Sequence, residues 1–171
     1  MRLKTLATLL LASSLSYALT VDMVNLETKD KIGTVEIKET KYGVEFKPNL
    51  EGLPPGLHGF HVHEHGSIES TVDKKTGKSV KGGAAGGHYD PENTKKHGLP
   101  WEDDSHKGDL PALYVDSTGV AQQPVLSSRL SLDEIKGKSL MIHMHGDNHS
   151  DTPSPLGGGG GRIAAGIIPT N

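Results

Sequence analysis

Cysteine is absent from the 171 residues of this chain. A disulfide therefore cannot stabilise the fold, and metal sites built from thiolates are excluded. Aromatic residues are scarce as well, at 4% of the chain, and only 33% of the residues are hydrophobic, whereas glycine (22) and proline (10) are plentiful. This composition favours short strands joined by structured loops over a bundle of helices.

An excess of positive charge is also missing. The formal net charge at pH 7 is −3, so the chain has no basic character that would indicate a nucleic-acid partner. Long hydrophobic runs are missing too. The apolar run over residues 6–15 is shorter than the roughly 20 residues that a membrane-spanning helix needs.

The same apolar run has the features of a secretory signal. Arg2 and Lys4 provide a positive start, and residues 16–18 (SYA) provide a small-x-small cleavage site. We therefore expect residues 1–18 to be a secretory signal peptide. The mature protein is then a single exported domain over residues 19–171, which is not inserted in the membrane once the signal has been removed.

Apolar and polar residues alternate along several stretches, as is typical of strands with one buried face. The predicted strands are 21–27, 32–40, 42–50, 58–63, 112–116, 119–126, 139–145 and 163–168. We expect 112–116 and 119–126 to pair with each other across a turn. Ser131 and Glu134 fit a capping box, which predicts a single helical turn.

The alternation stops over residues 66–111 and again over 146–162, where glycine, proline and other turn-forming residues dominate. A loop as long as the first is uncommon in a compact domain unless something holds it in place. The expected fold is an antiparallel β-barrel or sandwich that carries two long loops.

Histidines cluster in one stretch, GLHGFHVHEHG at residues 56–66, which contains four of the chain's 10 histidines. Side chains two residues apart in a strand share a face. His61 and His63 therefore project together, about 7 Å apart, a distance that two ligands of one metal ion can bridge. A bare H-x-H pair fits chance surface histidines equally well.

Further candidate ligands lie in the first long loop, where His88, His97, His106 and Asp109 fall within 22 residues. Three imidazoles and one carboxylate form a closed tetrahedral set suited to Zn²⁺. Such a set explains how a glycine-rich loop stays folded without a disulfide. His143 adds an imidazole from a distant strand, and imidazole-rich sites with an open position suit redox-active copper.

Motifs for other kinds of chemistry are missing. His63-Glu64 is not followed by the second histidine of an H-E-x-x-H zinc site, and the EF-hand and P-loop patterns do not occur. No serine lies in a G-x-S-x-G nucleophile context. The glycines at 157–161 are not followed by the Lys-Ser/Thr pair of a phosphate-binding loop.

The sequence resembles the copper/zinc superoxide dismutases of the bacterial, exported type. The resemblance covers nearly the whole mature chain and is carried by HGFHVHEHG, AAGGHYDP, HKGDLPAL, SLMIHMHGDN and PLGGGGGRIAAGII. It implies an all-β fold, a Greek-key antiparallel β-barrel (immunoglobulin-like sandwich) with two long loops forming the metal site. It further implies a periplasmic oxidoreductase that converts superoxide to oxygen and hydrogen peroxide at an imidazolate-bridged copper–zinc site. Such an enzyme protects the cell envelope from oxidative damage.

The resemblance also implies roles for individual residues. The expected copper ligands are His61, His63, His88 and His143. The expected zinc ligands are His88, His97, His106 and Asp109, so that His88 is shared by both metals. Asp147 is expected to accept hydrogen bonds from His61 and His97, which fixes their rings. Arg162 and His88 are the expected catalytic residues, Arg162 attracting superoxide and His88 delivering a proton.

The chain departs from this resemblance in its missing disulfide. The two cysteines of the family would fall at Ile68 and Ala165, which are both apolar here. Removing a native disulfide typically costs about 2–5 kcal/mol of stability. We hypothesise that Ile68 packs on Ala165 in place of the disulfide and that the fold depends more strongly on zinc.

Alternatives stay open at this point. An exported protein that binds or buffers copper without dismutase activity would need the histidines but not Arg162. A monomer and a homodimer are equally compatible with the sequence.

The four histidines outside the expected ligand sets have simpler explanations. His58 is expected to be a structural, hydrogen-bonding residue. His65, His145 and His149 are expected to be solvated. Trp101, in the first long loop, is expected to be a packing residue.

Overall fold

Strands dominate the computed structural model, which describes residues 17–171. The predicted signal peptide lies outside the described residues, apart from Tyr17 and Ala18. Within the described part of the chain, no helix is both long and apolar enough to cross a membrane.

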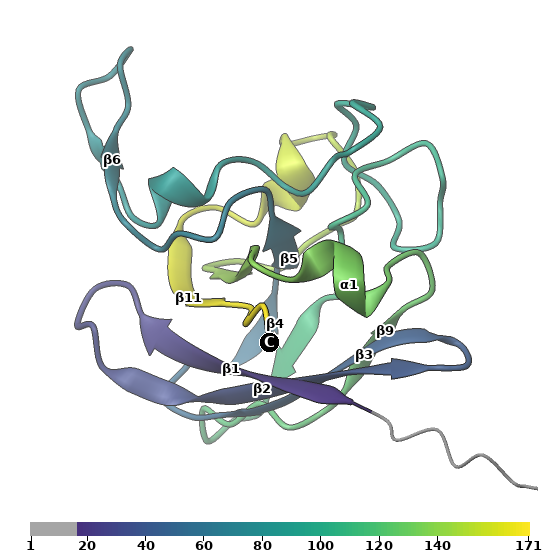
Figure 1. Cartoon of the computed structure of the whole chain (residues 1–171). Helices are drawn as coiled ribbons and strands as arrows, with labels where there is room; N and C mark the ends of the chain where they lie inside the picture. Colours follow the sequence, from purple (N-terminus) through teal and green to yellow (C-terminus); the bar gives the residue numbers. More distant parts are fainter. Residues whose placement is uncertain (1–16) are drawn as a thin grey trace, which may run out of the picture.

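Seven antiparallel strands form the main sheet. They are β1 (Ala18–Asn25), β2 (Lys31–Thr40), β3 (Gly43–Leu50), β5 (Phe60–His63), β9 (Val125–Ser127), β10 (Ser139–His143) and β11 (Arg162–Ile167). Their order across the sheet is β5-β10-β11-β1-β2-β3-β9. Figure 1 shows the sheet curling strongly, with β1 and β2 at the bottom of the view and β5 above them.

Shorter elements complete the described chain. Two two-stranded pairs join β4 (Gly56–His58) to β8 (Leu113–Val115) and β6 (Thr71–Val72) to β7 (Ser79–Val80). The helical elements are α1 (Leu132–Ile135) and the 3₁₀ turns η1 (Gly83–Ala85) and η2 (Leu156–Gly158). The predicted helical turn is confirmed, and the Glu134 carboxylate accepts a hydrogen bond from the Ser131 N–H at 2.6 Å.

The core lies inside the curl of the sheet. In β1, exposed and buried side chains alternate, and Leu19, Val21 and Met23 are buried. Phe46 on β3 and Phe60 on β5 are fully buried, and their rings meet edge to face with centroids 6.1 Å apart. Because β3 and β5 are far apart in the sheet order, this contact closes the barrel around one apolar interior.

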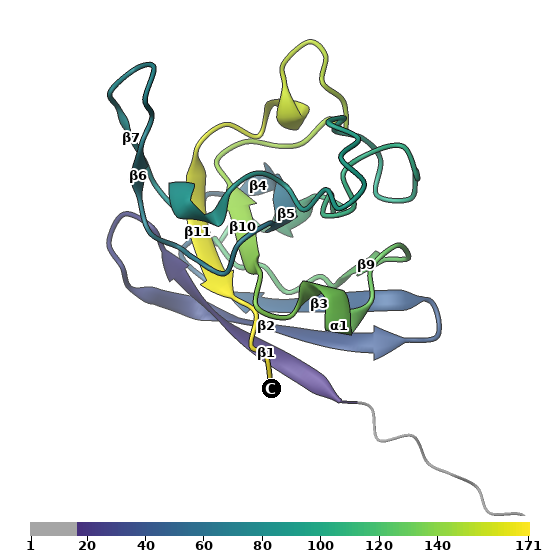
Figure 2. The ribbon, with the colours of Figure 1, turned by 45° about the horizontal axis from the view of Figure 1, so that its top comes forward.

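Most of both long loops lies on the same side of the barrel, above β1 and β2 in Figures 1 and 2, and the segment around Lys81 reaches the end of β1, where Lys81 pairs with Glu27. The first is held to β5 by main-chain hydrogen bonds. The N–H of Val62 donates to Gly108 O (2.9 Å), and the N–H of Tyr89 donates to Val62 O (2.8 Å). The N–H of Gly108 in turn donates to Tyr89 O (2.8 Å). Two distant parts of the loop therefore run beside the strand that carries His61 and His63.

The two positions of the missing disulfide share an apolar cluster. Ile68 is partly buried and packs against the buried residues Leu26, Ala85, Met141 and Ala165. The hypothesis that Ile68 packs where the disulfide would lie agrees with this cluster.

A buried hydroxyl also ties this segment to the barrel. Ser139 Oγ on β10 accepts a hydrogen bond from the Ser67 N–H at 3.0 Å. It lies 2.6 Å from His65 O and 2.8 Å from Ser67 O, and donates to one of them. The turn that precedes Ile68 is thus fixed to β10 through its main chain.

Two sequence expectations about strands and loops are wrong. Residues 112–116 and 119–126 meet only in a tight turn; β8 pairs with β4, and β9 pairs with β3. An alternating pattern determines which face of a strand is buried, but not which strand lies beside it. The first long loop is also not entirely irregular, because it contains the β6–β7 hairpin, which projects from the body of the molecule in Figure 2.

Candidate metal centre

Four buried histidines converge where β5 and β10 run side by side. His61 and His63 lie on β5, His143 ends β10, and Met141 on β10 is paired with His61. His88 comes from the first long loop, where its backbone pairs with His63. One ring nitrogen from each of the four histidines lies within 4.8 Å of those of the other three. His61, His63, His88 and His143 are named the strand group.

Main-chain carbonyls orient two of these rings. His63 Nδ1 donates to Gly86 O (3.0 Å), and His143 Nδ1 donates to Gly160 O (3.1 Å). A neutral imidazole carries one N–H, so Nε2 of each ring keeps a lone pair. These two Nε2 atoms are 3.5 Å apart. Two facing lone pairs repel each other unless they share a cation, so this pair of rings is suited to a metal ion.

A second group forms in the first long loop and also uses His88. Ligand atoms of His61, His88, His97 and Asp109 lie within 4.8 Å of one another. His106 lies at the edge of this cluster, with Nδ1 3.5 Å from Asp109 Oδ2 and its ring centroid 5.3 Å from that of His88. His88, His97, His106 and Asp109 are named the loop group.

His61 is close to both groups but has one nitrogen to offer. Its Nε2 donates to Asp147 Oδ2 at 2.6 Å, which leaves Nδ1 as its ligand atom. His106 Nδ1 is buried without a hydrogen-bond partner, beside the same Asp109 oxygen that His97 Nδ1 approaches at 3.0 Å. The available atoms therefore favour His106 over His61 as the fourth member of the loop group.

Asp147 connects the two groups. Its two carboxylate oxygens accept hydrogen bonds from His61 Nε2 (2.6 Å) and His97 Nε2 (2.8 Å). The side chain is fully buried, and the His149 N–H donates a further hydrogen bond to it at 2.7 Å. Because Nε2 of each ring donates to the carboxylate, Nδ1 is the atom of each ring that is left for a metal ion.

The free nitrogens test whether these residues fit a metal. The Nδ1 atoms of His61, His97 and His106 are buried and have no hydrogen-bond partner. Such orphaned buried atoms are unfavourable and uncommon in native proteins. Imidazole and carboxylate donors are the ligands that zinc and copper take in proteins. Both groups therefore fit divalent metal ions in their donor chemistry.

Burial keeps the strand group uncharged. The pKa of His61 and the pKa of His63 lie well below the usual value. Burial is the larger cause, and the neighbouring His88 is the second. Burial also lowers the pKa of His143 to about 4. At neutral pH these rings are in the deprotonated form that binds metals.

Carboxylates give the loop group a different charge state. Burial by itself lowers the pKa of His97, but the nearby carboxylates of Asp109 and Asp147 outweigh burial and raise this pKa to about 9. Burial by itself raises the pKa of Asp109 and of Asp147. Hydrogen bonds from the histidines outweigh it and hold both well below the usual range. This part of the site therefore carries fixed negative charge for a cation.

Arg162 lies beside the strand group. It is the first residue of β11 and is paired with His143 across the sheet. Its guanidinium donates to Gly86 O at 2.6 Å and to Gly82 O. Gly86 O also accepts the hydrogen bond from His63, so one carbonyl holds both the cation and the ring.

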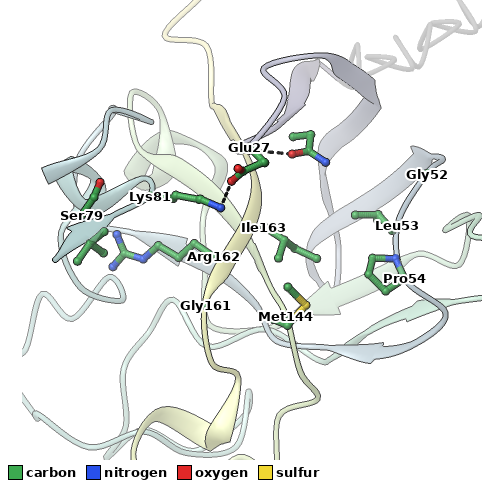
Figure 3. Close-up of a pocket in the computed structure, with 12 residues that line it drawn as sticks. Glu27, Gly52, Leu53, Pro54, Ser79, Lys81, Met144, Gly161, Arg162 and Ile163 are labelled. Carbon is green, nitrogen blue, oxygen red and sulfur yellow. Dashed lines mark hydrogen bonds and ion pairs between the residues drawn. The ribbon is translucent and has the colours of Figure 1, made fainter.

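A surface hollow of about 630 Å³ lies next to Arg162. Figure 3 shows Lys81, Glu27, Met144 and Ile163 around it, and Lys81 forms an ion pair with Glu27. No residue of the strand group or the loop group lines this hollow. It therefore adjoins the histidines instead of containing them.

Three of the remaining histidines behave as expected. His58 is buried, and its ring nitrogens lie 2.7 Å from His143 O and 2.8 Å from Pro54 O, which confirms a structural, hydrogen-bonding residue. His65 and His145 are exposed.

Two other expectations are wrong. Only 18% of the His149 side chain is exposed, because its ring lies beside Asp147, with Nδ1 3.8 Å from Asp147 Oδ1. Trp101 is 65% exposed and so is not a packing residue. Both residues lie in long loops, where no periodic pattern indicates which side chains turn inward.

Sequence reasoning also missed the carbonyls of Gly86 and Gly160, which orient His63 and His143. Both glycines have a positive φ, of 77° and 72°, a conformation that favours glycine. The glycine-rich stretches were therefore a signal for unusual backbone. They carried no information on which carbonyl faces a ring.

Comparison with known proteins decides the family. The family model described as copper/zinc superoxide dismutase (SODC) matches residues 31–168. The chain belongs to this family. A Cu-Zn superoxide dismutase of Photobacterium leiognathi is 58% identical over 155 residues, which are 91% of this chain and 88% of that protein. Another, of Actinobacillus pleuropneumoniae, is 59% identical over 138 residues, 80% of this chain and 72% of that protein.

Solved structures agree with this assignment. The Cu/Zn superoxide dismutase from Brucella abortus matches with a TM-score of 0.85 and 47% identity, over 89% of this chain and 99% of that one. The solution structure of a monomeric copper, zinc superoxide dismutase from Salmonella enterica matches with a TM-score of 0.77 and 50% identity, over 89% and 99%. The expected fold class is confirmed, and the two donor groups fit the copper and zinc of the family.

Proposed function

We propose that this protein is a superoxide dismutase, an oxidoreductase that converts two superoxide ions and two protons into oxygen and hydrogen peroxide. The strand group would hold copper and the loop group zinc, with His88 shared. Bound copper supplies the redox chemistry, one electron at a time. The polypeptide supplies ring orientation, attraction of the anion and a position for a proton.

The position of His88 carries this proposal. It belongs to both clusters of candidate ligand atoms. Its Nδ1 lies 2.8 Å from Asp109 Oδ1 in the loop group, so Nε2 is the nitrogen left for the strand group. A ring that served two cations would do so as an imidazolate. Nε2 of His88 is then the atom at which this ring could hold a proton for the peroxide product.

Arg162 provides the attraction for substrate. Superoxide is a small anion, and a guanidinium beside the strand group raises its local concentration there. Two carbonyls already fix the side chain, so little conformational freedom is lost when the anion arrives.

The copper-buffering alternative uses the same histidines but has no need for a fixed cation beside them. A buffer also needs no ring shared with a second metal. Arg162 and His88 therefore both support the enzymatic function over storage.

Superoxide consumption by the metal-loaded protein tests the proposal. We expect the wild-type protein to consume superoxide rapidly and in a cyanide-sensitive way. His88→Gln should lose most of this activity. His145→Gln, which changes an exposed histidine two residues after His143, should keep it. Copper-loaded wild-type protein that leaves superoxide untouched would favour the buffering function.

We also propose that residues 1–18 are removed on export and that residues 19–171 act in the periplasm, as a monomer or a homodimer. The support is the charged start, apolar run and cleavage site of the sequence. N-terminal sequencing of protein from the periplasmic fraction of a bacterial host should begin at Leu19. Uncleaved protein that stays in the cytoplasm would contradict export.

A further inference from the structure

Arg129 is a buried cation that the proposed reaction does not use. It lies between β9 and α1, and only 8% of its side chain is exposed. The carboxylate of Asp103, with Oδ1 3.7 Å from Arg129 Nε, is fully exposed. Exposed ion pairs stabilise little, so the guanidinium needs closer partners.

Those partners are in the first long loop. Arg129 Nη2 donates to Ser105 O at 2.9 Å. Nη1 donates to His106 O and to Ser105 Oγ, both at 3.2 Å. Ser105 and His106 are both buried. A single planar group therefore binds two consecutive residues of the loop, one of which is a member of the loop group.

His106 is less constrained than the other histidines of the loop group. A ring nitrogen of His88 is hydrogen-bonded to Asp109, and one of His97 to Asp147. The Nδ1 of His106 has no hydrogen-bond partner. Its main-chain bonds, from its N–H to Lys96 O (2.8 Å) and from the Asp109 N–H to its carbonyl (3.3 Å), both stay within the same loop. The bond from Arg129 to the His106 carbonyl is thus a link from this residue to the barrel.

We infer that Arg129 is a positioning residue for the zinc site, which fixes the backbone at Ser105–His106 and so directs His106 Nδ1 toward Asp109. The inference rests on the proposed role of the loop group as the zinc site. Mutation of groups that contact the ligands of a metal ion, but not the ion itself, typically lowers metal affinity by about 10–100-fold. Arginine suits this task because its fork offers several donors in a fixed plane, which one ammonium group does not reproduce.

The test compares Arg129→Met with Lys107→Met in the metal-loaded protein. The Lys107 ammonium binds Glu134 of α1 at 2.6 Å, so Lys107→Met also removes a tie between this loop and the α1 region. It leaves the His106 carbonyl untouched. The measurements are zinc transfer to a chromophoric chelator and the visible spectrum of Co²⁺ bound in place of zinc. For Arg129→Met we expect zinc release about 10-fold faster or more and an altered spectrum; Lys107→Met should stay within about twofold of wild type.

Arg129→Lys separates positioning from folding. It keeps the charge and can reach one carbonyl, so we expect zinc release between wild type and Arg129→Met. If Arg129→Met does not fold, Arg129→Lys against Lys107→Met decides the question. Wild-type zinc release and spectrum in the Arg129 variant overturn the inference. Equal acceleration in Lys107→Met also overturns it, because any loosening of the loop would then suffice.

His106→Ala distinguishes failure of the zinc site from failure of the inference. If it leaves the Co²⁺ spectrum unchanged, His106 is not a ligand and the proposed zinc set is wrong. If it changes the spectrum while Arg129→Met does not, the set stands and the role of Arg129 is wrong.

Discussion

The strand group and the loop group share His88 but are built by different parts of the chain. In the strand group, the pairing of β5 with β10 sets the backbone, and two rings donate to glycine carbonyls. In the loop group, the ligands come from irregular backbone, and carboxylates bind the rings. His61, His63 and His143 are in place whenever the barrel folds, whereas His88 and the rest of the loop group depend on whatever holds the loop in place.

The two groups also differ in charge. The strand group consists of neutral rings beside one fixed cation, which suits electron exchange with an anion. The loop group contains a buried carboxylate, which favours firm binding of a divalent cation. On the proposed assignment, a metal in the loop group would mainly stabilise the fold, whereas a metal in the strand group would mainly perform the reaction.

Removing the metals one at a time gives the largest expected effect. Because no disulfide holds the loop, zinc removal should lower the melting temperature by about 10 °C or more. A ligand at 1,000 times its Kd adds about 4 kcal/mol, and 1 kcal/mol shifts Tm by about 2–4 °C in a domain of this size. Removal of copper alone should shift Tm less. Calorimetry of the selectively depleted forms measures both, and a larger shift on copper loss would reverse the comparison.

In the metal-free protein, the strand group should lose its contribution to stability at acidic pH, and the loop group should lose its contribution at alkaline pH. The pKa of His143, at about 4, lies below the ordinary 6.5, so the unfolded chain binds the proton first. Its contribution is present above pH 6.5 and is lost as the pH falls toward 4, at about 1.4 kcal/mol per pKa unit. The pKa of His97, at about 9, gives a contribution that is present below pH 6.5 and is lost as the pH rises through 9.

Urea unfolding of the metal-free protein between pH 4 and pH 9 measures the free energy of unfolding at both ends of this range. With zinc bound, His97 no longer carries the extra proton, so the alkaline loss should disappear. A free energy of unfolding that stays constant as the pH rises toward 9 in the metal-free protein would contradict the charge state argued for the loop group.

Asp147→Asn tests the connection between the groups. The amide can accept from one ring only, and its NH₂ then faces the N–H of the other. We expect copper affinity to fall by about 10–100-fold and zinc affinity to fall less, because the loop group keeps Asp109. Metal analysis of the purified variant measures this. Asp116→Asn is the control, because Asp116 also accepts main-chain hydrogen bonds, from the N–H groups of Thr118 and Val120, but does so within the turn after β8.

Arg162→Ile should change the dismutation rate without removing either metal, and so affect the strand group alone. We expect the dismutation rate to fall several-fold or more, because the cation that attracts the anion is lost, while both metals stay bound. Lys81→Met, in the hollow beside Arg162, should have a smaller effect. A wild-type rate by pulse radiolysis would count against the role of Arg162.

The strand group was more predictable from the sequence than its surroundings. A period of two put His61 and His63 on one face, because strand geometry is regular. The spacing of His88, His97, His106 and Asp109 indicated a cluster within a single loop. Their convergence with the strand histidines followed from family resemblance, since no periodicity describes the path of a long loop.

What escaped prediction involves main-chain groups and packing partners. The carbonyls that bind His63, His143 and Arg162 belong to glycines, which have no side chain to mark their role. The pairing of β8 with β4 and of β9 with β3 depends on which apolar faces meet across the barrel. Alternation within one strand does not contain that information.

A diffraction experiment on crystals loaded with both metals tests the central claim most directly. Anomalous difference maps measured on either side of the copper and zinc absorption edges locate each element separately. The account predicts one copper peak and one zinc peak, with the imidazole of residue 88 between them and one ring nitrogen toward each. Peaks that leave this ring bound to one metal or to neither would contradict it.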